Sequence, residues 1–119
     1  KAGFEVLGGD TAPNHAFQTP LATLHAFQGW ADKFLTTPAG GVEDLYVGAS
    51  AGFGALALNL VRHDFGAEAT GDDYGTEWDV SVGYKFGQRY ELLAKYADYR
   101  DDGFATDTRK GWLQFAATF

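Results

Sequence analysis

The sequence predicts an all-β protein: an antiparallel transmembrane β-barrel, of which this chain supplies about six strands next to a short helix in a long loop. Three observations lead there. Apolar residues alternate with a period of two, the connections are alternately short and long, and aromatic residues gather near the expected strand ends. Abundant Gly (16) and aromatics (16%) with scarce Pro (3) also favour a β protein rich in turns. We expect one domain, residues 1–119.

The clearest strand covers residues 76–86, "TEWDVSVGYKF". Every second residue is large and apolar, and the residues between them are polar or small, which is the pattern of a strand with two different faces. Residues 90–99, "YELLAKYADY", repeat the pattern after the short turn "GQR". The two segments therefore form a hairpin with Phe86 opposite Tyr90.

Two segments upstream form a second expected hairpin, residues 43–52 and 55–65, around a tight turn at Phe53 and Gly54. If Gly52 opposes Ala55, the large apolar residues of both segments share one face. Residues 1–9 add a short strand, in which Phe4 and Val6 point outward, and residues 109–119 add the terminal one.

The connections differ in length from one end of the sheet to the other. Two are short turns, whereas residues 8–41, 64–75 and 100–107 are long and alternate with them. Outer-membrane barrels have short periplasmic turns, long external loops and aromatic girdles at both interfaces. A soluble antiparallel sheet is the alternative, since it also produces a period of two. The expected girdle residues are Trp78 and Tyr96 toward the long loops, and Phe53, Tyr84, Phe86, Tyr90 and Phe119 toward the short turns.

The long connection 8–41 predicts a short helix. Thr19 suits an N-cap and Pro20 the first helical position, and apolar residues follow at roughly helical spacing: Leu21, Leu24, Ala31, Phe34 and Leu35. Such an element would either constrict a pore or rest on the barrel rim as a lid, and both alternatives stay open.

Composition excludes several classes of function. The net charge of −7, spread along the chain, disfavours nucleic acid as a partner. The absence of Cys excludes disulfides and thiolate metal sites, and the most apolar segment, 47–61, is too short and Gly-rich for a membrane helix. No acidic spacing matches a calcium loop or a zinc site, so we expect no metal and no cofactor.

The opposite face of the strands carries the candidate functional residues. Lys85 faces Glu91, and Lys95 lies opposite Ser81 and diagonal to Asp79, so opposite charges attract across the sheet. Such a wall either screens solutes by charge or merely neutralises itself and becomes rigid. The expected lumen-facing residues are Asp44, Asn59, His63, Glu77, Asp79, Lys85, Glu91, Lys95, Trp112 and Gln114.

His63 is the one residue that suggests acid–base chemistry, because the expected register sets Asp44 opposite it. A nucleophile would still be required. Ser50 lies six residues along the strand from Asp44, roughly 20 Å by strand rise. We therefore expect no catalytic set on this hairpin and no enzyme.

The run "GGDTAPNHAFQTPLATLHAFQGWADKFLTTPAGGVEDLYV", followed by "HDF", "YGTEWDVSVGYKF" and "KYADY…FATDTRKGWLQF", resembles the C-terminal part of the bacterial alginate export family. Those proteins are outer-membrane β-barrels of Gram-negative bacteria, and the best-known members pass an anionic polysaccharide through a lumen rich in Arg and Lys. The resemblance implies that this chain is the last third of a monomeric barrel. The expected inner face here, with Glu77, Asp79 and Glu91 beside two lysines, departs from that electropositive pattern.

The expected function is an outer-membrane, porin-like channel for passive passage of hydrophilic solutes or an anionic polysaccharide. The alternative is a structural β-module that assembles with other copies or strands without transport, because exposed strand edges invite pairing. The terminal segment "RKGWLQFAATF" alternates up to Phe119 and resembles the signature that the barrel-assembly machinery recognises. We expect Leu113, Phe115, Ala117 and Phe119 to face lipid, the pair Arg109 and Lys110 to sit near the outer rim, and any missing part to precede Lys1.

Overall fold

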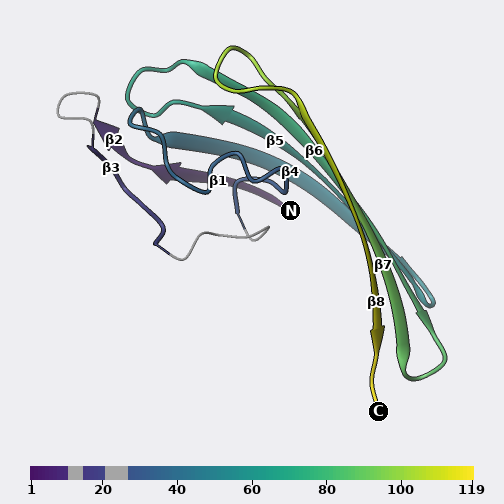
Figure 1. The fold of residues 1–119 in the computed structure, drawn as a ribbon. Coiled ribbons are helices and arrows are strands. Elements are labelled where there is room, and N and C mark those ends of the chain that lie inside the picture. Colours follow the sequence, from purple (N-terminus) through teal and green to yellow (C-terminus); the bar gives the residue numbers. More distant parts are fainter. Residues whose placement is uncertain (11–14, 21–26) are drawn as a thin grey trace.

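The computed structural model describes residues 1–10, 15–20 and 27–119, and most of them belong to one antiparallel sheet. Its six strands lie in the order β1-β4-β5-β6-β7-β8. Their bounds are Ala2–Leu7 for β1, Val42–Phe53 for β4, Leu56–Gly66 for β5, Asp73–Phe86 for β6, Tyr90–Arg100 for β7 and Thr108–Ala117 for β8. A separate small sheet pairs β2 (Gly9–Asp10) with β3 (His15–Ala16). The six expected strands are confirmed, and the sheet is open, with β1 and β8 at its edges (Figure 1).

The β6–β7 hairpin has the expected register. Phe86 pairs with Tyr90, Lys85 with Glu91 and Ser81 with Lys95. The turn that joins the strands is the predicted "GQR", in which Gly87 has a φ of 63° that favours glycine.

The β4–β5 hairpin has a different register from the expected one, by two residues. Gly52 pairs with Ala57 rather than Ala55, because the turn is at Gly54 and Ala55 and Phe53 still pairs with Leu56. Gly54, at a φ of 59°, supplies the left-handed residue of this turn. A shift of two residues leaves every side chain on its expected face.

All long connections lie at one end of the sheet and both short turns at the other (Figure 1). The connection between β5 and β6 is shorter than the expected 64–75, because strand structure continues to Gly66 and resumes at Asp73. An irregularity at Phe65 and Gly66 lets the pair of strands extend that far.

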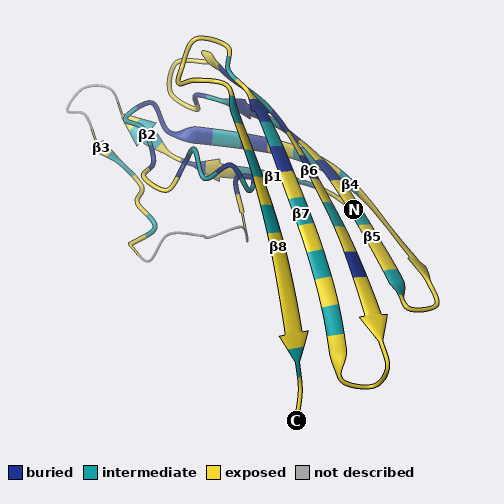
Figure 2. Ribbon diagram, turned by 45° about the vertical axis from the view of Figure 1, so that its right-hand side comes forward, coloured by how far each residue is buried: buried dark blue, intermediate teal, exposed yellow. Residues whose placement is uncertain are grey.

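The two faces of the sheet differ in what covers them. Residues 27–41, which we call the inward loop, lie over one face, the inner face, and the opposite face is the outer face. Burial on the inner face is greatest toward the long connections and falls toward the short turns (Figure 2). The outer face remains exposed along its length and carries most of the exposed large apolar side chains, among them Leu113 at 75% and Phe115 at 60%.

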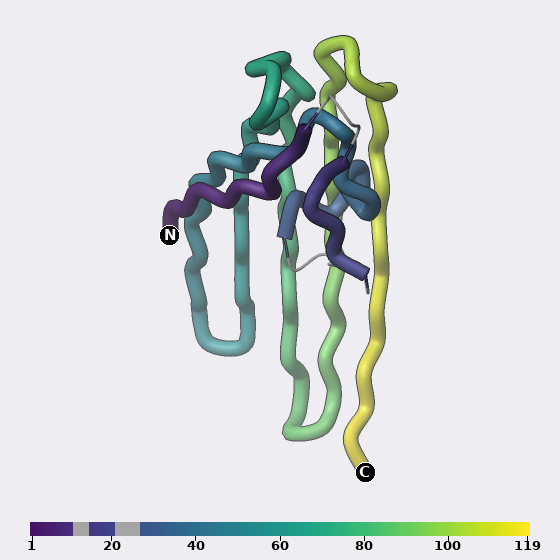
Figure 3. Tube along the Cα trace, turned by 90° about the vertical axis from the view of Figure 1, so that its left-hand side faces the viewer, coloured from purple at the N-terminus to yellow at the C-terminus, as the bar shows by residue number. Residues whose placement is uncertain are grey.

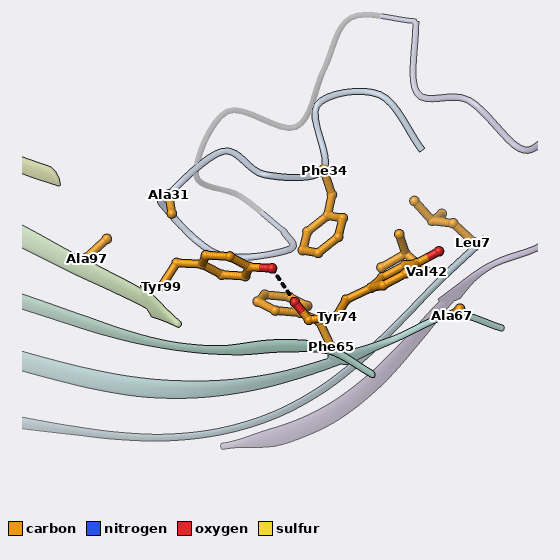
Figure 4. Close-up of a cluster of buried hydrophobic side chains, with 9 residues drawn as sticks. All are labelled: Leu7, Ala31, Phe34, Val42, Phe65, Ala67, Tyr74, Ala97 and Tyr99. Atoms are coloured by element: carbon orange, nitrogen blue, oxygen red, sulfur yellow. Dashed lines mark hydrogen bonds between the residues drawn. The ribbon is translucent and has the colours of Figure 1, made fainter. Parts of the chain in front are cut away.

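The hydrophobic core lies between the inner face and the inward loop (Figure 4). Phe34 of the loop packs against Phe65, Tyr74 and Phe104, with ring centroids 4.7, 5.9 and 5.5 Å away. The hydroxyl of Tyr99 donates a hydrogen bond to the carbonyl of Tyr74, which ties β7 to β6 inside this core. The buried apolar residues of the cluster are Leu7, Ala31, Phe34, Val42, Phe65, Ala67, Tyr74, Ala97 and Tyr99.

The expected helix is absent from residues 15–20 and 27–41, and residues 21–26, with Leu21 and Leu24, lie outside the described residues. The physical reason is local: Gln28, Gly29 and Asp32 have φ values of 50°, 74° and 59°, which a right-handed helix does not tolerate. Ala31 and Phe34 are nevertheless buried, whereas Leu35 is 40% exposed. Over the described ranges, no helix is long and apolar enough to cross a membrane.

Candidate functional site

The inward loop is the central feature of the inner face, because its contacts extend from one edge strand to the other. At the β1 side, the Gln28 amide donates to Glu5 at 2.7 Å. At the β8 side, the Lys110 ammonium donates to Asp32 at 2.9 Å. Figure 3 shows the segment in front of the strands. The loop therefore crosses the whole width of the wall that the sequence predicts to line a lumen.

A buried carboxylate fixes the centre of the inward loop. Glu77 on β6 has no exposed surface, and its Oε1 accepts hydrogen bonds from the backbone amides of Trp30 at 2.5 Å and Ala31 at 2.7 Å. The positive φ values of Gln28 and Gly29 turn successive amides toward one point, an arrangement that binds anions. Gly29 is required sterically as well, since a Cβ there would lie 2.7 Å from the Glu77 carboxyl carbon. Glu77, expected to face a lumen, is thus enclosed by the loop.

Two lysines hold the loop through aromatic rings. The ammonium of Lys95 on β7 lies 4.9 Å from the centroid of the Trp30 ring. The ammonium of Lys33, in the loop, lies 5.1 Å from the centroid of Tyr99 on β7. Cation–π contacts of this length are attractive, so strands and loop hold each other by reciprocal contacts.

His63 lies between two carboxyl groups. Its Nδ1 is 2.9 Å from both oxygens of Asp44, and its Nε2 is 3.6 Å from Oδ2 of Asp79. The expected contact of His63 with Asp44 is present, but the two residues are diagonal neighbours, because His63 pairs with Tyr46 and Asp44 with Phe65. All three side chains are buried.

This cluster lacks the nucleophile that hydrolysis would need. The Ser50 hydroxyl donates to Oδ1 of Asn59 at 2.8 Å, and Ser50 pairs with Asn59 four residues along β4 from Tyr46, the partner of His63. Four residues of strand correspond to about 13 Å. Among the described residues, no three His, Cys, Asp or Glu side chains are grouped to hold a metal ion.

The strands on the two sides of the loop carry mostly opposite charges, with Lys1, before β1, as a cation on the acidic side. Carboxyl groups come from β1 to β6, namely Glu5, Asp44, Glu77 and Asp79, whereas Lys95 and Lys110 come from β7 and β8. The ion pair between Lys110 and Asp32 was not predicted from the sequence, which assigned Lys110 to the outer rim with Arg109. Its position two residues before Trp112, on the same strand face, was the available signal.

The remaining expected lumen residues lie on the less covered part of the inner face. Lys85 faces Glu91 and Lys95 faces Trp112, as the register requires. Gln114 is opposite Leu93, in a stretch that the inward loop does not bury. The structure therefore brings Asp44, His63, Glu77, Asp79, Lys95 and Trp112 to the loop or its core, and leaves Lys85, Glu91 and Gln114 toward the short turns. Asn59 lies between the two groups, in a pocket that Trp30 of the loop also lines.

The seven expected girdle residues are exposed, six of them on outer-face strand positions and Phe119 beyond the end of β8. At the short-turn end, Phe86 lies 5.5 Å from Tyr90 and 6.2 Å from Phe115 by ring centroids. Phe115 belongs to this aromatic cluster, although the girdle prediction omitted it. Trp78 and Tyr96 lie toward the long connections on the same face, each close to half exposed.

A charged rim begins on the outer face level with Trp78, which pairs with Arg62 on β5 and with Asp98 on β7. Asp98 pairs with Arg100 at 2.9 Å and with Arg109 at 3.4 Å, and Arg62 pairs with Asp64 at 3.3 Å. Arg109 thus belongs to this group of ion pairs. Between Trp78 and Phe86, the outer-face positions of β5 to β8 carry no charged residue in the part of the chain described.

Beyond the rim, the Asp101 carboxylate makes the most hydrogen bonds within the 101–107 loop. Asp101 accepts hydrogen bonds from the amides of Ala105, Gly103 and Phe104. These bonds, with that of Ala105 the largest, hold the pKa of Asp101 below its ordinary value. The loop is therefore ordered by a charge that it keeps at neutral pH.

No protein family, no curated protein and no solved structure matches the chain.

Proposed function

We propose that the sheet is part of an outer-membrane β-barrel of a Gram-negative bacterium, which works as a channel for hydrophilic solutes without covalent chemistry. The observation that carries the proposal is the outer face: uncharged between Trp78 and Phe86, aromatic toward both ends, and charged from the level of Trp78 toward the long connections. Lipid is the solvent that favours such a surface.

The dimensions of this uncharged band suit a bilayer. Residues 78 to 86 are eight steps apart on β6, or about 27 Å along the strand. A tilt of ~40° reduces this to about 20 Å, close to the ~25 Å apolar band of outer-membrane barrels. Six strands do not close around a packed interior, for which about eight are needed, so β1 and β8 would pair with further strands.

The inner face would line the channel, and the inward loop would narrow it. The loop crosses the wall from β1 to β8 and is held there by Glu77, Lys95 and Lys110. The cargo would be a hydrophilic solute or, as in the family that the sequence resembles, an anionic polysaccharide. The outer-membrane lipid and, through Phe119, the barrel-assembly machinery would be the partners.

Reconstitution of the full-length protein in planar bilayers tests the proposal. We expect stepwise ion conductance, and a larger conductance for a variant that lacks residues 28–36, because that deletion removes the narrowing segment. A protein that inserts into the bilayer without any conductance would refute the channel.

A structural module is the second candidate, and the two open edges of the sheet favour it. Edge strands pair readily with other strands, so copies of this sheet would assemble without transport. Mass measurement in detergent separates the candidates: a uniform oligomer of the full-length protein that does not conduct would support the module, and a conducting monomer would support the channel.

A further inference from the structure

A polar pocket of about 160 Å³ lies on the inner face, between the inward loop and β1, β4 and β5. Its lining includes Glu5, Trp30, Asp44, Tyr46, Asn59 and His63. We propose that this pocket binds small organic cations that carry a primary ammonium group. The inference rests on the proposed channel, because a solute in its lumen would meet this pocket beside the loop.

Tyr46 forms an aromatic surface of the pocket. Its ring lies against Gly3, its partner on β1, where a Cβ would approach the ring within 2.4 Å. Glycine at this position lets the ring lie on the sheet instead of standing up from it. The flat ring can then offer its other face to a ligand, and a cation is attracted to such a face.

An alkylammonium group already borders the pocket. The Lys1 ammonium lies 5.7 Å from the centroid of the Tyr46 ring, and Lys1 is itself part of the lining. The Lys1 side chain is equivalent to n-butylammonium, so both the size and the charge of such a group fit at this site.

Two carboxylates provide the countercharge. Glu5 is half-buried and is oriented by the Gln28 amide at 2.7 Å. Asp44 is 1% exposed and is oriented by Nδ1 of His63 at 2.9 Å. Carboxylates held by neighbours are already oriented for a cation and disfavour an anion in the same space.

The position of the other charges makes the site selective. The two inner-face lysines nearest the loop, Lys95 and Lys110, come from β7 and β8 and contact Trp30 and Asp32, and neither lines the pocket. Lys1 is the lysine that does. Removal of that side chain therefore leaves the carboxylates without a competing ammonium group.

The test uses n-butylammonium as the probe and butyrate as its anionic counterpart, with the full-length protein in detergent and tryptophan fluorescence or calorimetry as the readout. We expect saturable binding of n-butylammonium only, and a gain of about threefold or more in affinity for Lys1→Ala, since the bound side chain no longer competes. Equal binding of the two probes, or no binding to Lys1→Ala, would overturn the proposal.

Two further variants locate the site. Glu5→Gln and Tyr46→Leu should each weaken binding about three- to tenfold. Glu91→Gln is the matched control, because Glu91 is an inner-face carboxylate outside the pocket. If Glu91→Gln weakens binding as much as Glu5→Gln, the effect comes from overall charge and the proposed site is wrong.

The binding assay and the bilayer assay test the cation site and the channel separately. Conductance without any n-butylammonium binding would refute the cation site and leave the channel standing. Binding without conductance would refute the channel and leave the cation site standing.

Discussion

The two faces of the six-stranded sheet reverse the usual distribution of residues. The outer face exposes large apolar side chains such as Leu113 and Phe115, while the inner face buries Asp44, Glu77 and Asp79. In water, apolar side chains are mostly inside and carboxylates almost never fully buried. The reversal is what the proposed channel requires, in which one face would meet lipid and the other a polar interior.

The inner face achieves part of this burial by giving its carboxyl groups partners, although the Asp79 oxygens accept no hydrogen bond from the described residues. Glu77 accepts two backbone amides, Asp44 contacts His63, and Lys110 contacts Asp32. A buried charge without partners is costly, whereas one with partners is tolerated. In the proposed channel, the apolar residues of the outer face would need no such partners, because they would meet hydrocarbon. The difference between the faces can be tested at neighbouring residues.

The largest expected effect comes from a charge on the outer face. Leu113→Arg should destabilise the protein in lipid vesicles by roughly 2–4 kcal/mol, because Leu113 lies near the middle of the uncharged band. Gln114→Arg is the matched control, because Gln114 is the next residue of β8 and lies on the opposite, inner face. It should lower the stability far less. Denaturant titration of folding in vesicles measures both. Equal costs would mean that lipid does not distinguish the two faces.

The next effect tests how the inner face holds its loop. Gly29→Ala should destabilise by roughly 1–3 kcal/mol more than Gly71→Ala, because excess atoms in a packed site cost that much. Gly29 and Gly71 have nearly equal φ values, 74° and 73°, but only the Cβ at Gly29 meets the Glu77 carboxyl. Chemical denaturation measures the difference. In a Glu77→Ala background the excess should largely disappear, and its persistence would show that the clash is elsewhere.

A smaller effect belongs to the ion pair at the β8 side of the loop. Lys110→Met should cost up to about 1 kcal/mol and should make the loop more sensitive to limited proteolysis, because the pair is partly exposed and screened by salt. Lys85→Met, on the uncovered part of the same face, serves as control. If proteolysis of the wild-type loop is unaffected by high salt, the pair contributes nothing to docking.

The smallest effect is a pH dependence outside both faces. The folded-state pKa of Asp101 is lowered, so its contribution to loop stability is present above the ordinary aspartate pKa of about 3.9 and is lost as pH falls through the folded value. The amide NMR signals of Gly103, Phe104 and Ala105 should therefore shift at a pH below the ordinary aspartate pKa. Asp101→Asn should remove that transition, and a transition that survives the substitution would assign it to another group.

The strands were predictable from the sequence because alternation is a local property. The alternation from Thr76 to Phe86 shows by itself which residues share a face of the strand. The GQR turn then sets the register with the strand that begins at Tyr90. The β4–β5 register was missed by two residues, because a turn at Phe53–Gly54 and one at Gly54–Ala55 leave the same residues on the same faces.

The inward loop was not predictable in the same way. The spacing of Ala31 and Phe34 fitted a helix, yet both residues are buried by a loop whose shape depends on Glu77, 46 residues from Ala31 in sequence. The function of Gly29 depends equally on that distant carboxylate. The local sequence pattern of the loop does not show that its backbone amides bind a carboxylate on a distant strand.

The order of the strands along the chain has a consequence for the order of folding. From β4 to β8 each strand pairs with its neighbour in sequence, whereas β1 reaches β4 only after residues 8–41. Closing a longer segment costs more chain entropy, and short hairpins form fastest. We expect the β4–β8 meander to fold first, and β1 to join it together with the inward loop. The free edge of β1 would then become available to a further strand only after the inward loop had covered the inner face.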